Sequence, residues 1–153
     1  MSLTVFLDAG PLGILTNPKR PPETVSALIW AVAMHRAGHR FIVPAIADYE
    51  VRRELERAGK VNGLAELDAW NNAAHDRYLL LTDSALRLAA KLWARARTAG
   101  FTTADPKEID SDVLIAAQAI DTGLSPSNFI IATGNVGHLA QFVPVALWVN
   151  IRP

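Results

Sequence analysis

The 153-residue sequence has no cysteine, no net charge and no long apolar run. Without cysteine there are no disulfides, thiolate zinc sites or cysteine nucleophiles. Lysine and arginine together number 15, as do aspartate and glutamate, so a phosphate-rich partner would have to be held by local basic patches or by metal ions. No stretch approaches the roughly 20 apolar residues of a membrane span, and the first residues lack the basic region of a signal peptide. We therefore expect a cytoplasmic protein without membrane contact.

Half of the residues are hydrophobic and a fifth are charged, which is typical of a globular protein with a sizeable core. Strand-like and helix-like segments alternate, which favours a parallel sheet of four to five strands with helices on both faces. We expect one α/β domain over residues 1–153. The expected strands are 3–7, 40–43, 77–81, 128–132 and 145–149. The expected helices are 23–37, 46–58, 62–74, 83–99 and 110–120, with a helical turn at 12–15 and a loop over 101–109.

Acidic and polar residues fall where strands end, or in helices beside those ends. Asp8 follows the first strand, and "ATGNVGH" (132–138) follows the fourth. In open α/β sheets, ligands bind beyond the carboxyl ends of the strands. Glu50 lies in the helix after the second strand, and Asp112 in the first turn of the helix before the fourth. Because burying a lone carboxylate is costly, these acids must be solvated, paired or bound to a cation.

Each acid also has a structural interpretation. Asp110 or Ser111 can cap its helix while Asp112 complements the helix dipole. Glu50 can lie on a solvated face with weak ion pairs. Against these readings, the run "VLIAAQAI" after Asp112 is almost wholly apolar, so this helix is buried on most sides and its acid should face a site. The remaining acids look like caps, turns or surface charges: Asp48, Asp68, Asp76, Asp83 and Asp121.

The order of these segments resembles the PIN domain, in particular the small VapC-type toxin ribonucleases, over essentially the whole chain. "VFLDAGPLGIL" is similar to the family's opening strand with its first acid, Asp8, and "VPAIADYEVRREL" to the segment with the second acid, Glu50. "DSDVLIAAQA" closely matches the family's D-x-x-I-A-A-x-A helix, which makes Asp112 the third acid. "IIATGNVGHL" matches the last strand and the turn after it, with Thr133 and Asn135 at the remaining site positions.

The resemblance implies a metal-dependent endoribonuclease, the toxin of a toxin–antitoxin pair, which forms a homodimer and is held inactive by a cognate antitoxin protein. Asp8 and Asp112 would be the principal metal ligands, and Glu50 would complete the site directly or through water. Carboxylate oxygens favour Mg²⁺ or Mn²⁺, and the bound ion would activate a water for attack on the RNA phosphodiester. Thr133 and Asn135 would fix a ligand, a water or a phosphate.

The sequence departs from the family pattern in two places. Ala9 and Gly10 follow Asp8, where the family often has a hydroxyl or amide side chain. Asn135 stands where a fourth carboxylate is common. An amide brings no charge, so the site can hold one ion or two. Asp110 either compensates or caps its helix, and His138 either touches the substrate or is a structural group.

Two other functions fit parts of the pattern. An acid after the first strand also suits phosphoryl transfer through an aspartyl-phosphate, but the second Asp that haloacid-dehalogenase-type phosphatases have two residues later is Gly10 here. The main alternative is a catalytically degenerate PIN-fold module that binds RNA or an antitoxin. Near Glu50, Arg52 or Arg53 would contact phosphate or lie on a solvated face. The four tryptophans are expected to fill the core or an interface.

Overall fold

The computed structural model describes residues 2–100 and 106–153. The strands in this part of the chain are β1 (Thr4–Leu7), β2 (Arg40–Pro44), β3 (Tyr78–Leu79), β4 (Phe129–Thr133) and β5 (Val145–Leu147). The α-helices are α1 (Ala9–Leu15), α2 (Pro22–Arg36), α3 (Ala45–Arg57), α4 (Val61–Asn72), α5 (Asp83–Thr98) and α6 (Pro106–Asp121). Two short 3-10 helices follow β4 and β5, at Leu139–Gln141 and Trp148–Asn150.

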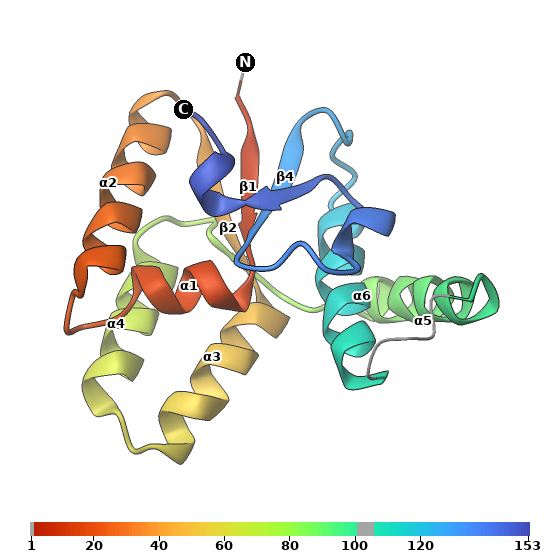
Figure 1. The fold of residues 1–153 in the computed structure, drawn as a ribbon, viewed down its shortest axis with the longest axis horizontal. Coiled ribbons are helices and arrows are strands. Elements are labelled where there is room, and N and C mark those ends of the chain that lie inside the picture. Colours follow the sequence, from red (N-terminus) through yellow and green to blue (C-terminus); the bar gives the residue numbers. More distant parts are fainter. Residues whose placement is uncertain (1, 101–105) are drawn as a thin grey trace.

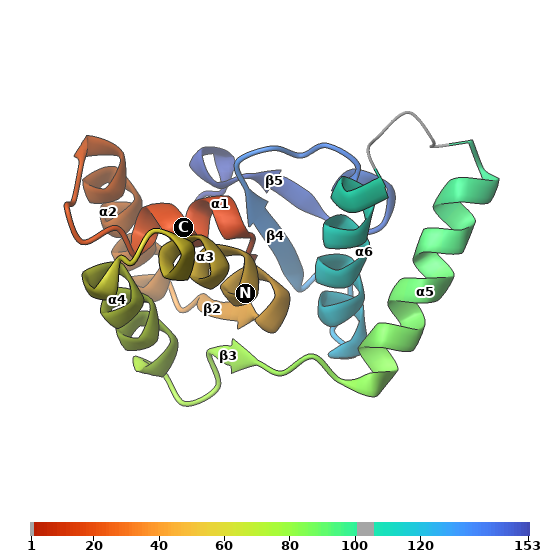
Figure 2. The same ribbon diagram turned by 90° about the horizontal axis from the view of Figure 1, so that it is seen from below.

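All five strands are parallel and form one sheet in the order β3-β2-β1-β4-β5. The central strand is β1, whose Thr4 pairs with Arg40 of β2 on one side and Phe129 of β4 on the other. Figures 1 and 2 show α1 to α4 on one side of the central strands and α6 with α5 on the other. The prediction of a single α/β domain with a parallel sheet and flanking helices is confirmed. None of the helices described here is both long and apolar enough to cross a membrane.

The core lies around the central strand. Val5, Phe6 and Leu7 are completely buried, and such an unbroken apolar run is expected when both faces of a parallel sheet are covered. Aromatic rings pack at one end of this core: Phe41 of β2 lies 5.3 Å from the ring of Trp30 and 5.9 Å from that of Trp70. The ring of Trp148 lies 5.5 Å from Trp30. Trp148 therefore belongs to the core, and Trp30 and Trp70 are half-buried against it, which agrees with the expectation, whereas Trp93 is 36% exposed.

The start of α6 differs from the expectation. Residues 106–109, expected in a loop, are helical, and the rest of that loop, 101–105, lies outside the described residues. A proline is well suited to the first position of a helix, where its missing N–H would have no partner in any case. Because α6 begins at Pro106, Asp110, Ser111 and Asp112 lie beyond its first turn. The interpretation of Asp110 or Ser111 as the helix cap is therefore wrong.

The third strand is also shorter than expected. The segment 77–81 contributes only Tyr78 and Leu79 to the sheet, where they pair with Val43 and Pro44. This strand lies at the edge, so it has a neighbour on one side only. An apolar run predicts a strand but carries no information on how far its pairing partner extends.

Candidate active site

The carboxylate of Asp8 lies at the carboxyl edge of the sheet and is held from two sides. Asp8 is the N-cap of α1, and its Oδ1 accepts a hydrogen bond from the Ala9 backbone N–H at 2.8 Å. Its Oδ2 accepts a second from the hydroxyl of Thr133, the last residue of β4, at 2.7 Å. Because β1 and β4 are parallel neighbours, their carboxyl ends meet at this point. The predicted proximity of Asp8 and Thr133 is therefore present in the structure.

The turn after β4 is organised by side chains. The Thr133 hydroxyl accepts a hydrogen bond from the backbone N–H of Asn135 at 3.1 Å, and Asn135 Oδ1 accepts one from the backbone N–H of Gly137 at 3.1 Å. Gly137 has φ of +46°, a conformation that favours glycine. The amide oxygen of Asn135 therefore stabilises the turn. His138 precedes the 3-10 helix at Leu139–Gln141, and its contact with substrate stays a prediction.

Glu50 projects from α3 toward Asp8 and α6. Its Oε1 accepts a short hydrogen bond from the hydroxyl of Ser111 in α6. Partial burial raises the pKa of Glu50 above its ordinary value, and the negative charge of Asp8 raises it further, while Ser111 and Arg53 act in the opposite direction. Asp8 and Glu50 are thus close enough to repel each other. The alternative of a merely solvated Glu50 does not fit these contacts.

Asp112 follows Ser111 directly in α6. On a helix, side chains three, four and seven residues apart share a face, and for Asp112 these are Ile115, Ala116 and Ala119, all at most 1% exposed. Asp112 is thus the polar residue at the N-terminal side of the buried face of α6. It directly follows Ser111, whose hydroxyl contacts Glu50. Among the described residues, no group of three or more histidine, aspartate or glutamate side chains is gathered tightly enough to form a ready metal cage.

Gln118, which was not among the residues predicted for the site, joins α6 to α3. Gln118 is 1% exposed, and its Oε1 accepts a hydrogen bond from the backbone N–H of Ile46 in α3 at 3.2 Å. Its Nε2 donates to the carbonyl oxygens of Leu79 and Leu80 at 3.1 and 3.2 Å. The same two helices meet again at a second contact, between Ser111 and Glu50. Ser111 lies two turns before Gln118 in α6, and Glu50 lies one turn after Ile46 in α3. The lone amide in an otherwise apolar run was the available signal, because a buried amide requires hydrogen-bond partners.

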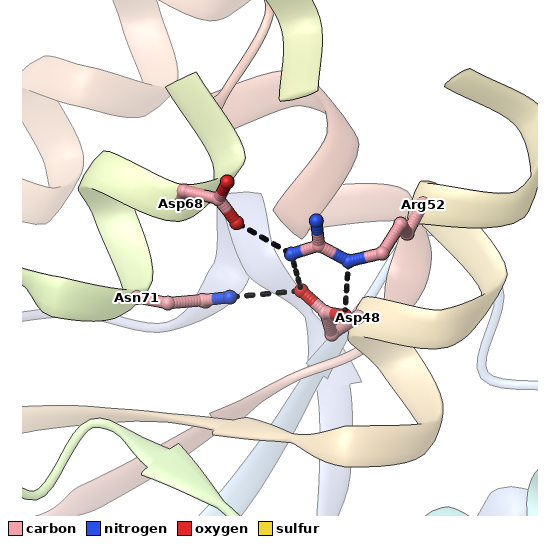
Figure 3. A network of polar contacts seen from close by, with 4 residues as sticks. All are labelled: Asp48, Arg52, Asp68 and Asn71. Atoms are coloured by element: carbon pink, nitrogen blue, oxygen red, sulfur yellow. Dashed lines mark hydrogen bonds and ion pairs between the residues drawn. The ribbon is translucent and has the colours of Figure 1, made fainter. Parts of the chain in front are cut away.

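Figure 3 shows that Asp48 and Arg52 belong to a structural network between α3 and α4. Asp48 is 5% exposed, and Arg52 contacts both of its carboxylate oxygens, Nε to Oδ2 at 2.9 Å and Nη2 to Oδ1 at 3.0 Å. Arg52 also reaches Asp68 at 2.7 Å, and the Asn71 amide donates to Asp48 at 2.8 Å. Asp48 is therefore not a surface acid. Arg52 is engaged here, which leaves Arg53 as the basic residue beside Glu50.

A groove of about 1150 Å³ begins at Glu50 and continues along α3. One wall is α1 with the chain after it, including Ala9, Gly10 and Lys19, and the far end is the turn between α3 and α4. Ala9 and Gly10 are the two residues after Asp8, so one end of the groove adjoins the carboxylates described above. Both positions, noted above as a departure from the family pattern, therefore present small side chains to the groove.

No family model matches the sequence, and no curated protein matches it either. Solved structures that match nearly the whole chain include the following three. VapBC2 from Rickettsia felis bound to a DNA fragment from its promoter has a TM-score of 0.68 and 15% identity, covering 95% of this chain and 99% of the matched one. The chain has a PIN-like fold. FitAcB from Neisseria gonorrhoeae matches with a TM-score of 0.62 and 20% identity over 96% and 99% of the two chains. VapBC-1 from nontypeable Haemophilus influenzae matches with a TM-score of 0.60 and 15% identity, over 97% of this chain and 100% of the matched one.

Proposed function

We propose that this PIN-like chain is the toxin of a toxin–antitoxin pair and acts as a metal-dependent endoribonuclease on RNA. The observation that carries the proposal is the position of two carboxylates at the carboxyl edge of the sheet: Asp8, held by Ala9 and Thr133, and Glu50, held by Ser111 and close enough to Asp8 to feel its charge. Two carboxylates that repel each other at a partly open edge are a site that a cation would stabilise. The similarity to VapBC and FitAB assemblies supports the toxin–antitoxin part of the proposal.

The residues present fit a hard divalent ion, because every candidate ligand is an oxygen. In proteins Mg²⁺ is usually held by one or two carboxylates together with waters and substrate phosphates, so a three-carboxylate cage need not exist before RNA binds. Asp8 and Asp112 would hold Mg²⁺ or Mn²⁺, with Glu50 as the third ligand directly or through water. When bound, such an ion would polarise the phosphodiester and lower the pKa of an attacking water.

The protein's own residues orient this site. The Thr133 hydroxyl and the Ala9 N–H hold the Asp8 carboxylate in one orientation. The Ser111 hydroxyl holds Glu50, and Gln118 fixes the spacing between the two helices that carry Glu50 and Asp112. Asn135 shapes the turn beside Asp8, where it would face a water or a phosphate. Such fixed positioning is what a reaction with little covalent participation by the protein requires.

The test is Mn²⁺-dependent cleavage of single-stranded RNA by wild type and two variants, Asp8→Asn and Asp112→Asn. Each variant keeps the side-chain size, removes one ligand charge, and is expected to abolish cleavage. Asp76→Asn is the matched control, because Asp76 pairs with Arg40 at the opposite, amino end of β2 and its side chain is 64% exposed. If Asp8→Asn or Asp112→Asn cleaves as fast as the wild type, the ribonuclease proposal is wrong.

A degenerate module that binds RNA or an antitoxin without cleavage is the second candidate. It is favoured by one observation: Asn135, in place of a common acid, has its amide oxygen occupied by the Gly137 N–H. Titration calorimetry separates the two. A folded protein that does not bind Mn²⁺ supports the degenerate module, and Mn²⁺ binding that Asp8→Asn removes supports the nuclease.

The partners follow from the same proposal. An antitoxin protein would inhibit the enzyme, and a toxin acting on cellular RNA would work in the cytoplasm.

The homodimer is a prediction as well, and α2 offers apolar side chains for it. Val25, Ile29 and Val32 recur at helical spacing and are 45%, 67% and 49% exposed. Light scattering on the isolated chain tests the dimer. A monomeric mass at micromolar concentration would contradict it.

A further inference from the structure

The groove along α3 is rich in positive charge. Four basic side chains line it, Lys19, Arg53, Arg57 and Lys60, against two acidic ones, Glu50 and Glu54. Arg57 pairs with Glu54 at 2.9 Å, while Lys19, Arg53 and Lys60 form none of the ion pairs found in the described residues. Since the whole chain has no net charge, this excess is local. A groove with surplus cations attracts a polyanion.

The position of the groove relates it to the reacting site. Glu50 lines its near end, and Lys60 its far end, beyond the end of α3. The eight helical steps from Glu50 to Ala58 extend about 12 Å along the helix axis. A strand whose scissile phosphate lay at the carboxylates would therefore pass over Arg53 and reach Lys60 as it left the site.

The uncharged lining indicates which part of a nucleic acid the groove contacts. It consists mostly of small and aliphatic residues, including Gly13, Val51 and Leu55, with three polar side chains, Thr16, Asn17 and Asn62, and the described lining contains no aromatic ring. Proteins hold bases without regard to sequence by stacking them on aromatic side chains, whereas cations contact the phosphates. This groove therefore suits the sugar–phosphate backbone better than stacked bases.

We propose that the groove holds the phosphate backbone of the RNA strand on one side of the cleavage point, with Lys19, Arg53 and Lys60 as the phosphate contacts. The inference rests on the proposed ribonuclease function and adds the path of the substrate. It follows that the groove contributes affinity for long substrates. Any stacking of bases on aromatic rings takes place outside the groove.

The experiment measures kcat and KM with Mn²⁺ on a long single-stranded RNA and on a short RNA that spans only the scissile bond. The variant Lys19→Ala/Lys60→Ala removes two exposed cations that lie away from the carboxylates. The matched control, Lys91→Ala/Arg95→Ala, removes two exposed cations from α5, which Figure 2 shows on the other side of α6 from α1 and α3.

For the groove variant on long RNA, we expect KM to rise roughly tenfold at low salt with kcat unchanged. The slope of log affinity against log salt should fall by about 0.7 for each cation removed. On short RNA, and in the control variant, KM should stay at the wild-type value. The proposal is overturned by an unchanged KM on long RNA, which is also the result if a peptide rather than RNA fills the groove. An equal rise on short RNA, or an equal rise in the control variant, overturns it as well.

Failure of the parent proposal can be told apart from failure of this one. If the wild type cleaves nothing, the ribonuclease function is wrong, and fluorescence anisotropy with the same labelled RNA and metal-free protein still tests the groove. The expected result is the same tenfold weakening in Lys19→Ala/Lys60→Ala and none in the control. Equal RNA affinity of wild type and groove variant overturns the proposed path.

Discussion

Replacing Gln118 by methionine tests whether one buried amide holds α6 in place. Methionine is unbranched like glutamine and has a similar volume, so it fills the same space and removes only the polar atoms. The wild-type amide makes three hydrogen bonds, to the Ile46 N–H and to the carbonyls of Leu79 and Leu80. The change therefore isolates hydrogen bonding from packing.

The expected cost follows from these bonds. Each contributes about 1 kcal/mol net, so the free energy of unfolding should fall by about 2–3 kcal/mol. For a chain of this size that lowers Tm by roughly 5–10 °C. Gln118→Ala loses the same bonds and leaves a cavity as well, so it should cost about 3–5 kcal/mol. The prediction includes the order of stability: the wild type is the most stable, Gln118→Met is less stable, and Gln118→Ala is the least stable.

Urea denaturation followed by circular dichroism measures these free energies, and Gln141→Met is the control on the exposed 3-10 helix after β4. Mn²⁺ titration of folded Gln118→Met adds a functional measurement, because Ser111 and Asp112 lie about two turns earlier in α6 and should shift with it. We expect weaker Mn²⁺ binding under conditions where the variant is fully folded. If Gln118→Met is as stable as the wild type to within about 0.5 kcal/mol, these bonds do not hold α6.

Three further predictions concern stability. The raised pKa of Glu50 means that the folded protein loses stability as pH rises through the ordinary glutamate pKa. Metal-free Glu50→Gln should therefore be more stable than the wild type at neutral pH and equally stable below about pH 4. Urea melts in EDTA at both pH values measure this, and equal stability of the two proteins at neutral pH contradicts it. Asp48→Ala should lower the free energy of unfolding by about 2–3 kcal/mol, less than the loss of a fully buried pair, because the Arg52 side chain is 33% exposed. The control Asp68→Ala removes a side chain that is 56% exposed and should lower it by less than about 1 kcal/mol. Equal losses of stability in denaturant melts would show that burial of Asp48 is unimportant. A Cβ at Gly63 would lie 2.7 Å from Leu55 Cδ2, so Gly63→Ala should destabilise the wild type but stabilise a Leu55→Ala background by up to about 1 kcal/mol through helix propensity; the same sign in both backgrounds would refute the clash.

The sequence was sufficient to predict the architecture because the relevant signals are local. Alternating apolar segments gave the strands and helices in the right order, and the expected helix 83–99 is found as α5, capped by Thr82. Asp8 was identified because an acid directly after a buried strand must be solvated, paired or bound to a cation. The segment 132–138, which contains its partner Thr133, was placed near Asp8 by the rule that parallel strands end at one edge. Each of these inferences needs only the pattern of one segment and the parallel topology.

The errors arise where the answer depends on contacts between segments. Asp48 and Asp68 look alike in the sequence, yet Asp48 is buried because α4 packs beside α3 and supplies Asn71. Arg52 was a candidate phosphate contact until two aspartates were found within hydrogen-bonding distance of its guanidinium. Ser111 was interpreted as a possible cap because the start of α6 was placed too late, and its contact with Glu50 could not be predicted without the crossing of α3 and α6.

The clearest separation of structure from function in this chain lies between two acids on one helix, Asp48 and Glu50. The charge of Asp48 is balanced by Arg52 on one side and an amide on the other, and this network joins two helices. Glu50, two residues later and therefore on a different face of α3, has a like charge nearby in Asp8 and a raised pKa. A carboxylate with its charge already balanced gains little from a cation, whereas one that repels its neighbour gains much. The same helix therefore uses Asp48 to hold the fold, and in the proposed metal site Glu50 is the acid that would bind the ion.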